Sequence, residues 1–365
     1  MSNIISKIEK IGSKKIFFSG LLLLFIIGIT DYLTGQDFSF YIFYAIPVLI
    51  TTWFCGRKYG LYLIIITILF WAADNFYNRQ THIITIQPYY EISVQTLFFI
   101  LIVVIFSSLK KSFEDKRALE MKKIQREMEI AREVQINMYP KFKPEINGAE
   151  YYGVCFPASI VGGDYYDYIK ISDDKFAFAV GDVSGHGIGP ALLMAGLVGF
   201  VRSNAAAYSE NLTEFVKSVN INLCGISEES MFATFFYAVL NCKDMTFTFV
   251  NAGHNPPLLF RKNKNSFDSL NTGDLFIGAI TEVSFHQSAT EFEKGDLLVM
   301  YTDGVTETFN NKNEQFGEDR LKDIIKNNSA RDISDIIKTI KNELENFSGK
   351  KPQADDITML IIRAV

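Results

Sequence analysis

Four short motifs in the second half of the chain each place an aspartate beside a glycine or a turn, at the edge of an apolar run. They read GGDYYD at residues 162–167, GDVSGHG at 181–187, YTDGVTE at 301–307 and DDIT at 355–358. A single aspartate at such a junction is usually a turn former, because its carboxylate accepts hydrogen bonds from nearby backbone amides. Four that converge without a cation would repel one another, which would raise their pKa values and destabilise the fold.

A shared divalent cation would remove that conflict. Ligation by oxygen atoms alone favours Mg²⁺ or Mn²⁺ over Zn²⁺. Two such ions bridged by one carboxylate would activate a water molecule for in-line attack on phosphorus. The motifs therefore indicate metal-dependent phosphate chemistry, provided that the fold brings them together.

The elements around these motifs predict an α+β domain, which we assign to residues 141–365. Strands are expected over residues 150–156, 164–171, 175–183, 232–240, 246–250, 297–301 and 357–362, and helices over residues 189–207, 212–224, 318–326 and 333–347. The strands come in meander-like pairs and the helices in consecutive pairs, rather than in strict alternation. This order favours largely antiparallel sheets.

The motifs, taken in order, resemble a known enzyme family. Together with AREVQ at residues 131–135, PALLM at 190–194, MFATFF at 231–236 and NAGHNPP at 251–257, they resemble the SpoIIE-like (RsbU-like) branch of the PPM-type metal-dependent serine/threonine protein phosphatases. The resemblance covers about residues 125–365. It implies an α-β-β-α sandwich with two Mn²⁺ or Mg²⁺ ions between two antiparallel sheets.

The resemblance also implies roles for individual residues. Asp182 matches the carboxylate that bridges both metal ions, and the carbonyl oxygen of Val183 matches a backbone ligand. Asp303 matches a further metal ligand, and Asp164 matches an acid that holds metal-bound water. This constellation predicts that hydroxide held by the metals attacks a phosphoserine or phosphothreonine directly, without a phospho-enzyme.

Three positions leave alternatives open. Either Asp355 or Asp356 is the last metal ligand, because adjacent strand residues point to opposite faces and only one can face the metals. His186 is either a displaced proton donor or a helix-entry residue packed between glycines. For His254, one glycine and two prolines within residues 251–257 favour a structural role in a tight hairpin connection over a catalytic role.

The first 110 residues differ from the rest in composition. They contain eight Lys or Arg and five Asp or Glu, whereas the other 255 residues contain 28 and 36. Four stretches without Asp, Glu, Lys, Arg or His predict a four-span transmembrane helical module over residues 1–109. These stretches are residues 16–30, 38–55, 59–73 and 92–109. The basic residues cluster on one side of the four spans, so the positive-inside rule places both termini in the cytoplasm.

Residues 110–140 predict a connector helix, because they are charged, rich in helix formers and free of proline up to Pro140. A stripe of mostly apolar residues recurs in it at spacings of three and four: Met121, Ile124, Met128, Ala131, Gln135 and Met138. Such a stripe favours a parallel coiled coil in a homodimer. The same stripe could instead pack on the α+β domain.

These features predict a multi-pass protein of the inner (cytoplasmic) membrane whose cytoplasmic domain is a protein serine/threonine phosphatase. The resemblance implies that the substrate is a phosphorylated STAS-domain anti-sigma-factor antagonist in a bacterial signalling pathway. One alternative is a non-catalytic membrane receptor with a degenerate phosphatase fold, and another is a phosphoesterase that acts on a small phosphorylated molecule. A formal net charge of −5 argues against a nucleic-acid partner.

Overall fold

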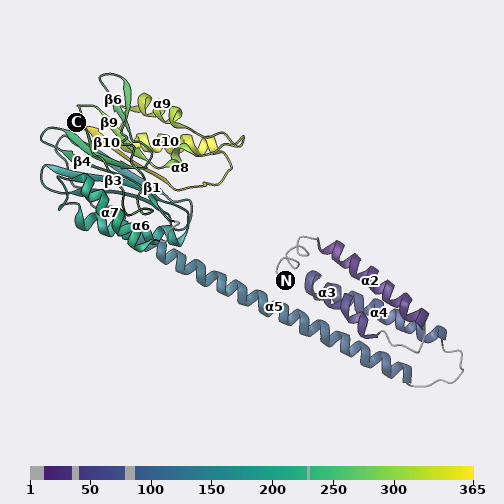
Figure 1. Cartoon of the computed structure of the whole chain (residues 1–365). Helices are drawn as coiled ribbons and strands as arrows, with labels where there is room; N and C mark the ends of the chain where they lie inside the picture. Colours follow the sequence, from purple (N-terminus) through teal and green to yellow (C-terminus); the bar gives the residue numbers. More distant parts are fainter. Residues whose placement is uncertain (1–11, 35–40, 79–86, 228–230) are drawn as a thin grey trace. The chain divides into compact units, whose positions relative to one another are not determined.

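The computed structural model describes residues 12–34, 41–78, 87–227 and 231–365. The chain divides into two compact units, Met1–Ile124 and Gln125–Val365, which we call the N-terminal unit and the β-rich unit. In Figure 1 the N-terminal helices are purple and blue, and the β-rich unit runs from teal to yellow.

The N-terminal unit is helical. It contains α2 (Ser13–Thr34), the short 3₁₀ helix η2 (Tyr41–Tyr44), α3 (Ala45–Cys55), α4 (Arg57–Asn78) and the first part of α5 (Gln87–Ile136). Small residues bring these helices close together. A Cβ atom added to Gly20 would lie 2.4 Å from Oγ1 of Thr51, and one added to Gly60 would lie 2.1 Å from Oγ1 of Thr52. Close backbone approach at small residues is typical of helix pairs in membranes.

Helices cover the described parts of all four predicted spans, but they differ in length. Within the described residues, two helical segments are long and apolar enough to cross a membrane: Ser13–Thr34 and Tyr90–Ile136. Helix α3 has 11 residues, which is about half of the ~20 residues that a bilayer requires. Residues 38–40 of the second predicted stretch lie outside the described residues.

The predicted stripe of the connector is divided between two environments. Met121 and Ile124 are 67% and 51% exposed, whereas Gln135 is 6% exposed. Met138 packs against the apolar core of the β-rich unit. The C-terminal half of the stripe therefore packs on the α+β domain, as the second alternative states, and the N-terminal half stays exposed.

The β-rich unit contains two five-stranded sheets in which every pairing is antiparallel. The first sheet has the order β1 (Ala149–Phe156), β10 (Ile357–Ala364), β9 (Leu297–Tyr301), β6 (Leu258–Arg261) and β7 (Ser266–Ser269). The second has the order β2 (Asp164–Lys170), β3 (Lys175–Val183), β4 (Ala233–Asn241), β5 (Thr246–Ala252) and β8 (Ser288–Glu291).

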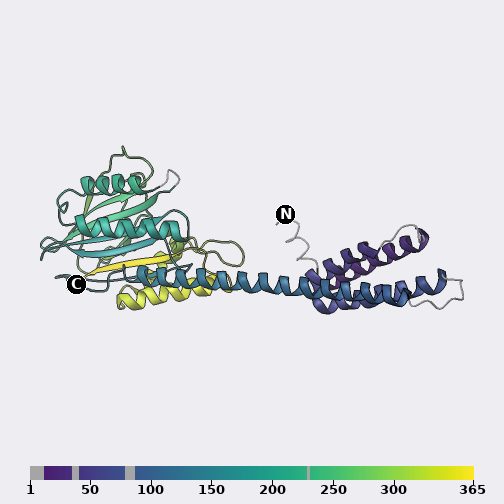
Figure 2. The same ribbon diagram turned by 90° about the horizontal axis from the view of Figure 1, so that it is seen from below.

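Two pairs of helices cover the outer faces of the sheets, as Figures 1 and 2 show. Helices α6 (Ile188–Asn204) and α7 (Leu212–Ile226) pack on the second sheet, and α9 (Glu318–Asn328) and α10 (Ile333–Ser348) pack on the first. A third apolar cluster fills the space between the sheets. A short helix, α8 (Asp303–Thr306), follows β9. These layers confirm the predicted α-β-β-α sandwich.

Two expectations about the sandwich are wrong in detail. Strands β6, β7 and β8 were not predicted, because each has four residues, too few to show a clear hydrophobic period. Residues 251–257 do not form a hairpin connection. They lead from β5 in the second sheet to β6 in the first, so this glycine- and proline-containing segment carries the chain from one layer to the other.

Candidate functional site

The five predicted aspartates lie at strand ends of both sheets. Asp164 is the first residue of β2 and pairs across the ladder with Asp182 in β3. Asp303 lies two residues after the end of β9, and Asp355 and Asp356 lie immediately before β10. Asp303, Asp355 and Asp356 are all close enough to Asp182 to raise its pKa. The structure therefore brings all five acids into one neighbourhood, which we call the carboxylate site.

The acids of the carboxylate site oppose one another's ionisation. Burial, together with the charges of Asp303, Asp355 and Asp356, raises the pKa of Asp182 to about 7. Burial raises the pKa of Asp164 well above its ordinary value, and the charge of Asp182 adds to it. Burial and the charge of Asp355 raise the pKa of Asp303. Over the described ranges, none of the five carboxylates forms an ion pair with a basic side chain.

Asp355 and Asp356 lie in different surroundings. Asp356 is 6% exposed, and its Oδ1 and Oδ2 accept hydrogen bonds from the amides of Ala158 at 2.7 Å and Gly163 at 2.9 Å. Asp355 is exposed, and its charge raises the pKa of Asp182. Asp356 thus holds the loop that precedes β2, whereas the carboxylate of Asp355 is open to solvent beside the other acids.

Asp164 is fixed by groups that the sequence analysis did not single out. Its Oδ2 accepts a hydrogen bond from Oγ1 of Thr302 at 2.8 Å, and that hydroxyl oxygen accepts one from the amide of Thr358 at 3.0 Å. The hydroxyl of Tyr139 donates to the carbonyl oxygen of Asp164 at 3.0 Å. Thr302 lies in the YTDGVTE motif and Thr358 in the DDIT motif. Their position next to the acids in the sequence was the signal that could have identified them as part of the site.

The glycine pair of the GGDYYD motif allows the backbone to approach the site closely. A Cβ atom added to Gly162 would lie 2.0 Å from Oδ2 of Asp356, and one added to Gly163 would lie 2.7 Å from the carbonyl oxygen of Val183. Any side chain at these two positions would displace an acid or a predicted backbone ligand.

A cavity of about 190 Å³ opens beside the acids. Its lining includes the loop before β2, the exposed side chain of His186, and both Asp355 and Asp356. His186 follows Gly185 and precedes Gly187, which have φ angles of 93° and 94°. Glycine adopts this left-handed region without strain, so the two glycines form the turn that brings His186 to the cavity.

His254 links the two sheets. Its Nδ1 lies 2.8 Å from Oγ1 of Thr234 in β4, and its Nε2 lies 3.1 Å from the carbonyl oxygen of Tyr301 in β9. Because a carbonyl oxygen only accepts, Nε2 carries the proton and Nδ1 accepts from the threonine hydroxyl. Burial lowers the pKa of His254 to about 4, against the opposing effect of the Tyr301 carbonyl. These contacts give His254 the structural role that its sequence context favours.

The acids fit a hard divalent cation by their donor chemistry. Among the described residues, no three His, Cys, Asp or Glu side chains converge closely enough to enclose a metal ion as they stand. The donors nevertheless consist of oxygen atoms alone, and the raised pKa values mark a lack of nearby positive charge. Mg²⁺ and Mn²⁺ prefer such ligands. Asp182 and Asp303 are half-buried and Asp355 is exposed, so all three have solvent access for an entering ion.

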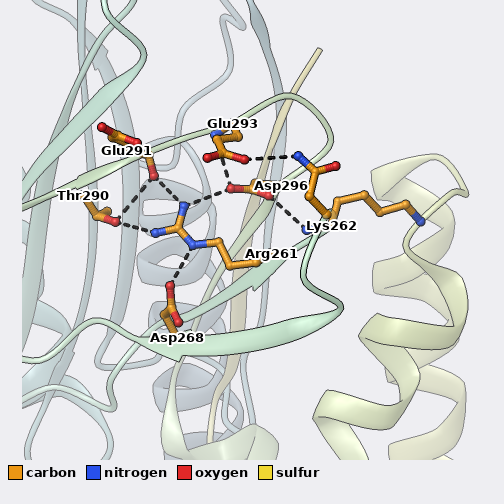
Figure 3. Close-up of polar contacts among 8 residues, drawn as sticks. Arg261, Lys262, Asp268, Thr290, Glu291, Glu293 and Asp296 are labelled. Carbon is orange, nitrogen blue, oxygen red and sulfur yellow. Dashed lines mark hydrogen bonds and ion pairs between the residues drawn. The ribbon is translucent and has the colours of Figure 1, made fainter.

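A second group of acids, which we call the Arg261 network, lies at the start of β9. Arg261 donates hydrogen bonds to Asp268 at 2.7 Å, to Asp296 at 3.0 Å and to the carbonyl oxygen of Glu291 at 2.7 Å. Figure 3 shows these contacts. Asp296 is 1% exposed and also accepts from the amide of Lys262 at 3.0 Å. The network ties β6, β7, β8 and the start of β9 together with its own cation.

Comparison with known proteins gives a family match over just over half of the chain. Residues 172–365 match the model of the family described as stage II sporulation protein E (SpoIIE). RsbU of Bacillus subtilis, which is named a phosphoserine phosphatase, is 28% identical over 240 residues, covering 66% of this chain and 70% of RsbU. Protein IcfG of Synechocystis sp. is 28% identical over 267 residues, covering 65% of this chain but only 41% of IcfG.

A solved structure has the same fold as the β-rich unit. The SiaA-PP2C domain of Pseudomonas aeruginosa superposes with a TM-score of 0.61 at 18% identity, covering 68% of this chain and all of that domain. At this identity the likeness establishes the sandwich fold alone.

Proposed function

This chain belongs to the SpoIIE family, and from that membership we propose that residues 141–365 form a metal-dependent protein serine/threonine phosphatase. The observation that carries the proposal is the carboxylate site, where five aspartates meet without a basic partner in the described residues. Such an arrangement of like charges destabilises the fold unless a cation binds between them. RsbU, which is named a phosphoserine phosphatase, is 28% identical to this chain over 240 residues.

We assign two Mn²⁺ or Mg²⁺ ions to the carboxylate site. Asp182 would be shared between the two ions, with the Val183 carbonyl, Asp303 and Asp355 as further ligands. We choose Asp355 over Asp356 because both carboxylate oxygens of Asp356 already accept backbone hydrogen bonds. Bound divalent ions would lower the pKa of a water molecule and neutralise the negative charge of the phosphoryl group.

The chain's own residues would support that chemistry by position. Asp164 is buried and held through Thr302, so its carboxylate is suited to accept a hydrogen bond from water in the site. Asp356 holds the loop that forms one wall of the 190 Å³ cavity. A phosphoserine side chain would enter through this cavity, which is lined by Asp355 and His186.

We propose that the substrate is a phosphorylated protein, namely a STAS-domain anti-sigma-factor antagonist. The support is the similarity to RsbU and the resemblance of the ordered motifs to its branch of the family. A small phosphorylated molecule is the alternative. It predicts equal or better turnover of a generic aryl phosphate than of a phosphoserine protein. The retained acids argue against a non-catalytic receptor, which would have no need of them.

We propose that the N-terminal unit anchors the protein in the cytoplasmic membrane with four spans and with both termini in the cytoplasm. Support for two of the spans comes from α2 and α5. For the other two it comes from α3 and α4. Thr51 of α3 packs closely against Gly20 of α2, and Thr52 of α3 packs closely against Gly60 of α4. Homodimerisation would use the exposed half of the connector stripe, at Met121 and Ile124.

The test of the proposed function removes one charge at a time. Asp182→Asn and Asp303→Asn should each lower phosphate release by about 1000-fold, equivalent to ~4 kcal/mol of transition-state stabilisation. The control is Asp173→Asn, the same change at an aspartate that is 92% exposed, which should keep wild-type activity. The readout is Mn²⁺-dependent phosphate release from a phosphoserine protein by the full chain in detergent. Full turnover by both site variants would reject the proposal.

A further inference from the structure

The side chain of Gln135 joins the end of α5 to the loop that precedes β2. Its Nε2 donates a hydrogen bond to the carbonyl oxygen of Gly162 at 2.7 Å, and its Oε1 accepts one from the Gly162 amide at 3.0 Å. Gln135 is 6% exposed, so both bonds are shielded from water. One side chain thus fixes both backbone polar groups of one loop residue.

The loop fixed in this way is a wall of the carboxylate site. Gly162 lies directly against the carboxylate of Asp356, where there is no room for a side chain. The next residue, Gly163, donates to the same carboxylate at 2.9 Å and lies against the carbonyl oxygen of Val183. Asp164 follows immediately. A displacement of Gly162 would therefore also move Gly163 and Asp164, and with them the contact to the Val183 carbonyl, which we propose as a backbone ligand.

Docking of the connector on the domain does not by itself require a carboxamide at this position. Met138 already packs on the apolar core three residues further along the chain. A buried carboxamide carries a desolvation cost that its two hydrogen bonds must offset, whereas an apolar side chain at position 135 would contribute burial without that cost. What Gln135 adds beyond docking is a directional link to a single residue of the loop.

We propose that Gln135 is a positioning residue: it holds residues 158–163 in the place from which Asp164 and the Val183 carbonyl can serve the metal site. The inference rests on the proposed function. Because Gln135 lies in the last turn of α5, a rotation or shift of that helix end would move the loop through the carboxamide. Residues that do not touch a metal ion but orient its ligands typically change metal affinity by about 10- to 100-fold when replaced.

The test measures Mn²⁺ binding directly in the full chain in detergent, by the electron paramagnetic resonance signal of free Mn²⁺, alongside phosphate release. Gln135→Met keeps the length of the side chain and removes both hydrogen bonds. It should lower Mn²⁺ affinity by about 10- to 100-fold, with phosphate release recovering at saturating Mn²⁺. Gln135→Glu, which loses only the donor, should lower the affinity in the same direction and replaces Gln135→Met if that variant does not fold.

Met138→Ala is the matched control, because it removes packing of the connector without touching the loop. It should lower the unfolding temperature and keep wild-type Mn²⁺ affinity. Unchanged affinity in the folded Gln135 variants, or an equal loss in Met138→Ala, would overturn the inference and leave the proposed function standing. If the wild-type chain neither binds Mn²⁺ nor releases phosphate, the proposed function itself fails.

Discussion

The carboxylate site and the Arg261 network lie at opposite ends of one strand. Asp296 precedes β9 directly, and Asp303 follows it after one residue. Both groups gather aspartates from several elements. In the Arg261 network the guanidinium lies between two carboxylates and bonds to both of them. In the carboxylate site, burial and mutual repulsion raise the pKa values of Asp182, Asp303 and Asp164 instead.

The difference separates acids that hold the fold together from acids that, in the function we propose, bind a cation. Asp296 is buried, but Arg261 and two backbone amides satisfy its carboxylate. Asp182 is only half-buried and already has a pKa of about 7. An aspartate that remains so unfavourably placed at the junction of two sheets is better explained by a bound cation than by stability. Four experiments test this difference between the two groups of acids.

The largest stability effect is expected from Asp296→Asn. The change leaves Arg261 in a site where it is 13% exposed with one charged partner fewer, which should cost about 3 kcal/mol in the free energy of unfolding. Chemical denaturation of the full chain measures it. Phosphate release per folded molecule should stay at the wild-type level, because the network contains no proposed ligand. A selective loss of turnover would mean that the two groups of acids are not independent.

Metal addition should affect only the carboxylate site. At a Mn²⁺ concentration of 100 times the dissociation constant, the binding of one ion should stabilise the wild-type β-rich unit by about 2.7 kcal/mol. The shift should be abolished by EDTA, absent in Asp182→Asn and complete in Asp296→Asn. The measurement is the thermal unfolding temperature of each protein with and without Mn²⁺. An equal shift in Asp182→Asn would place the ion elsewhere.

His254 tests whether a histidine near the acids belongs with the fold or with the chemistry. Its pKa is lowered to about 4 in the folded chain, so the unfolded chain binds more protons between pH 4 and its ordinary pKa of 6.5. Stability should therefore fall as the pH falls, by about 1 kcal/mol between pH 7 and pH 5.5. His254→Gln should lack this contribution, while acids common to both proteins titrate equally. An unchanged pH dependence in the variant would contradict the buried neutral state of His254.

Local patterns in the sequence predicted aspartates at strand ends and largely antiparallel sheets, whereas the four-layer sandwich was implied by the family resemblance. The role of these aspartates as metal ligands stays a prediction. Asp164, Asp182 and Asp303 stand beside glycines or turns at strand ends, and antiparallel strand pairs explain why such ends meet. The choice between Asp355 and Asp356 was not accessible. It depends on which carboxylate the loop amides of Ala158 and Gly163 reach, nearly 200 residues away in the chain.

The features that the sequence analysis missed depend on long-range contacts. Arg261 donates hydrogen bonds to Asp268 in β7, to the Glu291 carbonyl in β8 and to Asp296 just before β9. No spacing in the sequence predicts that these residues lie together. Gln135 was visible as the polar member of an apolar stripe and as the last residue of the AREVQ motif, but neither pattern predicted its hydrogen bonds to Gly162. In the N-terminal unit, apolar composition marked four stretches, but it could not show that α3 would have only 11 residues.

Asp268→Asn should produce the smallest effect and calibrates the comparison within the Arg261 network itself. Asp268 bonds to the same guanidinium as Asp296 does, at 2.7 Å, but its side chain is 50% exposed. Solvent screens an exposed pair, so the loss should be below about 1 kcal/mol in the free energy of unfolding. The same denaturation measurement compares it with Asp296→Asn. If the two substitutions cost the same, burial does not determine how much an acid of this network stabilises the fold, and the contrast with the carboxylate site loses its physical basis.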